Sequence, residues 1–101
     1  MEHDPIVENF KKWMNKCVEL FAKKHADYGP NNIAKFGEVG VMVRLNDKFE
    51  RLLNLFLNGK NPNNEAIEDT LMDIANYAII WLMIRAKEWP NAKSFKITKE
   101  D

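Results

Sequence analysis

Two aspartates four positions apart carry the clearest chemical signal in this sequence. Asp69 and Asp73 stand in the segment EDTLMDIANYAII, residues 68–80, whose apolar spacing predicts a helix. Residues four apart share a helix face, with Cβ atoms about 6 Å apart, so the two carboxylates could hold one cation. Magnesium takes such oxygens and keeps water and substrate phosphates as its other ligands, so it is the cofactor that this spacing predicts. The alternative, a solvated acidic first turn, better suits Glu65 and Glu68.

Asp73 is followed by a stretch that is apolar on every side, and a carboxylate beside such a stretch needs a partner. Asn76 and Tyr77 come three and four positions later, so they extend the face of Asp69 and Asp73 into one polar strip. Such a strip is typical of a binding site. The alternative is that the same residues form hydrogen bonds inside the core and bind no ligand. We therefore expect it to face a ligand.

Three cations share one face of the preceding predicted helix. Arg44, Lys48 and Arg51 are spaced four and three apart, which brings their side chains to the same side. Such a face can bind phosphate groups. An exposed face with ion pairs, such as Asp47 to Arg51, explains this helix equally well when it is taken alone.

A turn after the first predicted helix combines a cation, a carboxylate and an aromatic ring. Lys24, Asp27, Tyr28 and Gly29 belong to the segment KHADYG, residues 24–29. A nucleobase could stack on Tyr28 while Lys24 meets a phosphate. The alternative is a helix C-terminal cap with an aspartate turn, which needs no ligand.

Cys17 is the only cysteine, and it lies on the apolar face of the first predicted helix without a base beside it. It therefore forms no intramolecular disulfide and suits a core thiol better than a nucleophile. The sequence contains no phosphate-binding glycine loop, dinucleotide-binding glycine motif, serine nucleophile motif or zinc-site spacing. These reaction classes have no support.

Three predicted helices must position the side chains described above. Asp4 and Pro5 form an N-cap and a first helical position, apolar residues then recur at helical spacing, and the helix runs to about His25 or Ala26. Glycine, proline and asparagine residues at 27–32 end this helix and predict a loop, which we expect to be functional.

The rest of the chain predicts a short helical piece and two longer helices. The short piece, residues 33–36, ends at Gly37, and a longer helix follows from about residue 39 to 58, with a glycine as its stop. An asparagine in the next turn caps the last helix, which runs to about Glu88 because Pro90 follows. The sequence therefore predicts an all-α fold, a small bundle of three main helices plus a short helical piece, completed by oligomerisation.

Length and charge limit the function further. The 101 residues suit a single domain, 1–101, with a polar, lysine-rich tail at 91–101 that we expect to be flexible or to lie on a neighbour. Lysine plus arginine and aspartate plus glutamate both number 15, so no overall field attracts nucleic acid or an anionic membrane. The longest apolar run, residues 77–84, is too short to span a membrane. It still leaves apolar surface in so small a helical domain, so we expect a homo-oligomer.

The first ten residues lack the basic and apolar regions of a signal peptide. Together with the single cysteine, this indicates the cytoplasm, where thiols stay reduced.

Three segments occur in an order that is typical of one family. They are KHADYG (24–29), VRLNDKFERLLNL (43–55) and EDTLMDIANYAII (68–80). Together they resemble the phage and bacterial family called nucleotide modification associated domain, type one, over residues 15 to 85. That family is similar to the all-α nucleotide pyrophosphohydrolases of the MazG and dimeric dUTPase type, which are helical, usually oligomeric and magnesium-dependent. The resemblance implies a nucleotide ligand.

The resemblance also implies site residues. In those enzymes two helices supply E-x-x-E and E-x-x-D, and the matching positions here are Asp47 with Glu50 and Thr70 with Asp73. Thr70 stands where an acid is expected, and Asp69 lies about 100° around the helix from that position. We expect Glu50, Asp69 and Asp73 to be the metal ligands and the catalytic residues.

Three functions remain open. In the first, magnesium bridges the phosphates of a nucleoside triphosphate and an activated water releases pyrophosphate. In the second, the missing acid leaves a protein that binds a nucleotide without hydrolysing it, such as a phage sponge for a nucleotide second messenger of host defence. In the third, the chain is a helical assembly module with no small ligand. The first two share the same expected nucleotide-binding residues, Lys24, Asp27, Tyr28, Gly29, Arg44, Lys48, Arg51, Asn76 and Tyr77.

Overall fold

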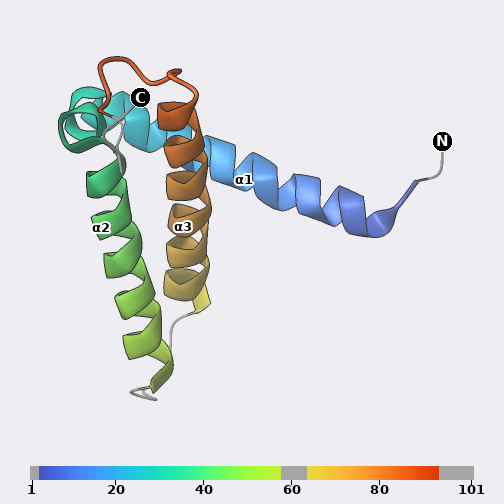
Figure 1. Ribbon diagram of the computed structural model, residues 1–101. Helices are drawn as coiled ribbons and strands as arrows, with labels where there is room; N and C mark the ends of the chain where they lie inside the picture. Colours follow the sequence, from blue (N-terminus) through green and yellow to red (C-terminus); the bar gives the residue numbers. More distant parts are fainter. Residues whose placement is uncertain (1–2, 58–63, 94–101) are drawn as a thin grey trace.

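The computed structural model describes residues 3–57 and 64–93, which form three α-helices and no strand. These are α1 (Pro5–Tyr28), α2 (Asn31–Leu57) and α3 (Asn64–Arg85). α2 and α3 lie side by side as a hairpin, and α1 crosses near one end of it with its N-terminal half projecting away from both (Figure 1). The prediction of an all-α fold with three main helices is confirmed.

Both ends of α1 are set by local capping. The Asp4 side chain accepts a hydrogen bond from the Ile6 N–H at 2.9 Å, and Pro5 opens the helix, as the sequence predicts. At the other end Gly29 adopts a positive φ of 72° and donates its N–H to the carbonyl oxygen of His25 at 2.8 Å. The expected loop at 27–32 is therefore wrong in its extent, since α1 continues through Tyr28 and α2 begins at Asn31.

Gly37 bends α2. Its φ of 59° and ψ of −145° break the helix locally, so the expected short piece and the longer helix are two arms of one bent element. A Cβ at this position would collide with the carbonyl oxygen of Lys93, which also accepts a hydrogen bond from the Glu38 N–H at 3.1 Å. The first residues of the predicted tail, up to Lys93, therefore pack against the bend in α2.

α3 ends three residues earlier than predicted, at Arg85. The N–H groups of Lys87 and Glu88 donate to carbonyls of the last helical turn, at 3.0 and 2.8 Å, and Lys87 takes a left-handed φ of 60°. This pattern is a Schellman motif, which turns the chain sharply. The turn brings Trp89 back into the protein, where it is only 6% exposed.

A buried glutamate clamps α2 to α3. Glu38 follows the bend, is 2% exposed, and accepts hydrogen bonds from the Trp81 Nε1 at 2.5 Å and from the Arg85 Nη1 at 3.0 Å. A carboxylate can be buried at this position because charged and neutral donors satisfy it.

The core lies where α2, α3 and the segment after α3 meet. Its buried apolar residues are Ala34, Val41, Ile80, Ile84 and Trp89. α1 contributes no buried residue, but its half-buried Phe21 packs against this cluster. None of the described helices is long and apolar enough to cross a membrane.

Three expectations lie outside the described residues. They concern the stop of the second helix at residues 58 and 59, the asparagine cap before α3, and the tail from residue 94 onward.

Candidate functional site

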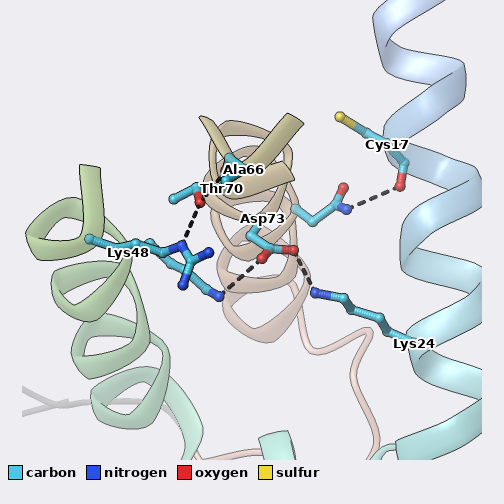
Figure 2. Close-up of polar contacts among 8 residues, drawn as sticks. Cys17, Lys24, Lys48, Ala66, Thr70 and Asp73 are labelled. Carbon is cyan, nitrogen blue, oxygen red and sulfur yellow. Dashed lines mark hydrogen bonds and ion pairs between the residues drawn. The ribbon is translucent and has the colours of Figure 1, made fainter. Parts of the chain in front are cut away.

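One carboxylate on α3 joins all three helices. Asp73 is 8% exposed, and its Oδ1 pairs with the Lys24 Nζ of α1 at 2.8 Å. Its Oδ2 pairs with the Lys48 Nζ of α2 at 3.0 Å. Figure 2 shows the aspartate between the two lysines, which reach it from opposite sides. Each carboxylate oxygen therefore has an ammonium partner, which offsets much of the cost of burying the charge.

Thr70 lies one helical turn before Asp73, at the position where the resemblance expects an acid. It is 2% exposed, donates to the Ala66 carbonyl at 2.7 Å and accepts from the Arg51 Nε at 3.1 Å (Figure 2). A neutral hydroxyl thus holds Arg51 against α3. The ion pair from Asp47 to Arg51, expected for a plain solvated face, is absent among the described residues.

Asn76 ties α3 to α1 on the other side of Asp73. Its Nδ2 donates to the carbonyl oxygen of Cys17 at 3.0 Å. Burial raises the pKa of the Cys17 thiol, because a thiolate is poorly solvated there. The neutral thiol agrees with the interpretation of Cys17 as part of the apolar face rather than as a nucleophile.

A hollow of about 300 Å³ opens between the three helices around Asp73. Its volume lies in the range of small-molecule pockets. Among the described residues, three cations and one carboxylate line it, so this lining carries an excess of positive charge in a chain whose net charge is zero. The lining residues are the cations Lys24, Arg44 and Lys48, the carboxylate Asp73, the rings Phe21, His25, Tyr28, Tyr77 and Trp89, the amides Asn32 and Asn76, and Gly29, Ile33 and Ile80.

Three rings form one wall of this pocket. Phe21 and His25 stack with centroids 5.5 Å apart, and Trp89 meets both edge-on, at 6.1 and 5.6 Å. The Trp89 Nε1 donates to the Pro30 carbonyl at 3.1 Å, which fixes the turn between α1 and α2. Aromatic contacts of this geometry favour a rigid wall.

A second hollow, of about 340 Å³, adjoins the pocket along α2. It is lined by Arg44, Asp47, Lys48, Arg51 and Tyr77, three of which also line the pocket. The cation face predicted from the spacing on α2 is therefore one continuous surface that leads out of the pocket.

The structure brings most of the predicted site residues together. The pocket contains eight of them: Lys24, Tyr28, Gly29, Arg44, Lys48, Asp73, Asn76 and Tyr77. Arg51 lines the adjoining hollow. Asp27, Glu50 and Asp69 are exposed and line neither hollow. The roles assigned to all of these residues stay predictions.

The donor set does not fit a magnesium cage within one chain. Both oxygens of Asp73 pair with lysines, while Glu50 and Asp69 are exposed and line neither hollow. Among residues 3–57 and 64–93, no group of three or more histidine, cysteine or acidic residues is placed to hold a metal ion. Ligation by Glu50, Asp69 and Asp73 is thus still a prediction, without a converging geometry in this chain.

Six lining residues were not predicted: Phe21, His25, Asn32, Ile33, Ile80 and Trp89. A local signal exists for the first two, because residues 21, 24, 25 and 28 share one face once α1 is extended to Tyr28. Trp89 carries no such signal, since the turn after α3 determines where its ring lies.

The chain matches a known protein family. A family model described as nucleotide modification associated domain 1 matches residues 24–84, more than half of the chain. The matched span contains Asp73, Thr70 and all the cations of both hollows, and it leaves out the projecting half of α1. The search of curated proteins and the search of solved structures gave no match.

Proposed function

Because the chain belongs to the nucleotide modification associated domain 1 family, we propose that it binds a nucleotide in the pocket between its three helices. The observation that carries this proposal is the convergence of Lys24, Arg44 and Lys48 on a hollow whose described lining has a single carboxylate and an aromatic wall. Cations bind phosphate oxygens through charge-assisted hydrogen bonds, and rings offer a surface for a base.

The phosphates lie against α2 in this proposal. Arg44 is half-buried and forms no ion pair with any described residue, so its guanidinium is available for two parallel hydrogen bonds to a phosphate. Lys48 and Arg51 continue the cationic surface along the same helix. A chain of two or three phosphates can follow this surface.

The base and sugar lie at the α1 side of the pocket. Tyr28 is 73% exposed at the mouth, whereas Tyr77 is half-buried deeper in. Stacking of a base on such a ring contributes about 1–3 kcal/mol. The amide of Asn32 can donate to and accept from the edge of a base.

Binding without hydrolysis is the form of this function that we favour. Asp73 is the one carboxylate that lines the pocket within the described residues, and two lysines occupy it. Thr70 provides a neutral hydroxyl where the pyrophosphohydrolase pattern has an acid. A protein with these features sequesters a nucleotide, as a sponge for a signalling nucleotide would.

Magnesium-dependent hydrolysis of a nucleoside triphosphate is the second candidate. Its support is Asp69, which precedes Asp73 by one helical turn, together with the resemblance to the MazG and dimeric dUTPase type. Hydrolysis requires that the Asp73 carboxylate break its ion pairs with Lys24 and Lys48. It also requires that further carboxylates come close enough to Asp73 to share a metal ion with it.

Neutral variants of the pocket cations test the proposed site. We expect Lys24→Gln and Arg44→Gln each to weaken nucleotide binding about tenfold or more, measured by calorimetry, because each loses a charge-assisted contact. Lys23→Gln is the matched control, since this neighbouring lysine is exposed and lines neither hollow. Equal affinities for all three variants would place the ligand elsewhere.

Analysis of the bound species separates the two candidates. The protein is incubated with nucleoside triphosphates and cyclic nucleotides, with and without magnesium, and bound and released species are chromatographed. Intact nucleotide held at one equivalent per site supports sequestration, whereas monophosphate and pyrophosphate formed only with magnesium support hydrolysis. If no nucleotide binds or raises the melting temperature, nucleotide binding itself is excluded.

A further inference from the structure

The apolar face of α1 is covered along only half of its length. Cys17 and Phe21 on this face lie against α3 and the core. Ile6, Phe10 and Trp13 continue the same face toward the N-terminus at helical spacing, but they are 77%, 67% and 39% exposed. In Figure 1 this half of α1 projects away from both α2 and α3. A helix that presents apolar side chains without a partner gains little stability from propensity alone.

α3 is apolar on the side that faces away from Asp73. Five residues at helical spacing form this outer face, and all are exposed: Leu71, Ala75, Ala78, Ile79 and Leu82. Because Ile80 and Ile84 are buried on the inner side, the C-terminal half of α3 is apolar on both sides, and such a helix is ordinarily buried on both. The two alanines at the centre allow another helix to approach closely.

The accessible surface is too large for a compact monomer of this mass. The chain of 11.8 kDa exposes 8037 Å², whereas about 5,900 Å² is expected for a folded monomer of that size. The excess, roughly 2,100 Å², is more than the 800 Å² or so that each partner buries in a stable interface. The exposed area is therefore large enough to supply a stable interface with another copy of this chain.

The charges around the two apolar surfaces are opposite. Lys12 and Lys16 lie over the Trp13 ring, with Nζ atoms 5.7 and 4.6 Å from its centroid. Glu68 is exposed on the first turns of α3, at the edge of its outer face. Each chain carries both complementary surfaces. Two copies related by a two-fold axis can therefore bury both surfaces of each chain at once.

We propose that two copies of this chain pair reciprocally, so that the projecting half of α1 from each lies across the outer face of α3 of the other. Lys12 and Lys16 then lie near Glu68 of the other copy. The pocket around Asp73 opens on the opposite side of α3 and is not part of this interface.

Sedimentation velocity from low to high micromolar concentration tests the pairing. We expect the wild type to sediment at twice the chain mass, and Phe10→Glu and Ala78→Glu to sediment at the chain mass of 11.8 kDa with unchanged helical circular dichroism. Asn15→Glu on α1 and Asn46→Glu on α2 add the same charge at exposed sites off both surfaces and keep the pairing. A monomeric wild type, or paired variants, would overturn the proposal.

Disulfide trapping tests the reciprocal geometry without relying on a destabilising charge. In a Cys17→Ala background, Trp13→Cys and Ala78→Cys chains are mixed and oxidised. Formation of a cross-linked species only in the mixture supports contact between α1 of one copy and α3 of the other. A pair that forms in solution but never cross-links in the mixture shows a different interface and refutes the proposal.

Discussion

Thr70 and Asp73 on the inner face of α3 are 2% and 8% exposed, whereas Leu71 and Leu82 on its outer face are 50% and 66% exposed. At these two polar positions α3 reverses the usual pattern of a surface helix, which has apolar residues inside and polar residues outside. The polar residues can stay inside because each has a partner, on Arg51 or on two lysines. The two faces of α3 therefore differ in role. The inner face contributes polar side chains to the pocket, whereas the outer face leaves apolar side chains exposed that a partner could bury.

The largest effect expected from this contrast concerns packing. Ile84→Ala removes a side chain that is 2% exposed and should lower the free energy of unfolding by about 3 kcal/mol, because it leaves a cavity. Leu82→Ala on the outer face should change it by less than about 0.5 kcal/mol in dilute protein. Urea denaturation measures both, and equal losses would show that the outer face is already packed in the single chain.

Asp73→Asn should have a smaller effect on stability and a decisive one on function. We expect a loss of about 1–2 kcal/mol, since the two lysines that lose their partner are partly exposed. If the chain only sequesters a nucleotide, the variant still binds it, because the freed lysines can contact phosphate.

If the chain hydrolyses a nucleotide with magnesium, the same variant loses turnover. Binding and product chromatography on one preparation measure both properties. Asp69→Asn is the matched control for stability, since this aspartate is exposed and should unfold like the wild type.

Thr70→Val tests whether the hydrogen bond from Arg51 to the Thr70 hydroxyl stabilises the protein, since valine has nearly the same shape but no hydroxyl. The near-isosteric change leaves Arg51 without its acceptor and should cost about 1 kcal/mol in thermal or chemical unfolding. Thr70→Ser keeps the hydroxyl and should retain most of the Arg51 contact. An unchanged melting temperature in the valine variant would mean that the Arg51 contact contributes nothing.

The smallest effect is expected for Leu71→Gln on the outer face. In dilute protein its free energy of unfolding should lie within about 0.5 kcal/mol of the wild type, because the side chain is half exposed. At high protein concentration the wild type should gain stability by association while the variant gains less. Melting temperatures of both proteins across a concentration series measure this difference. An equal rise in melting temperature for both would argue against burial of this face in a protein interface.

Local sequence determined the helices and the residues that each presents on one face. Periodic apolar positions, the Asp4 cap, the bend at Gly37 and the polar strip around Asp73 depend on residues within a few positions of one another. The cation face of α2 also followed from spacing alone. Such features are readable because the helix fixes how side chains three and four apart are arranged.

Tertiary structure decided which of these faces meet. The lysine that pairs with Asp73 most closely is 49 positions away, and no local pattern selects it. Asp69 and Asp73 lie one helical turn apart, but Asp69 is exposed and Asp73 is buried. The reason is that Asp73 lies where α1 and α2 both approach α3. Trp89 enters the pocket wall through a turn that follows the observed end of α3, inside the stretch that the sequence predicted to be helical. Helix periodicity sets the direction of each side chain, whereas its burial and partners depend on how distant helices cross.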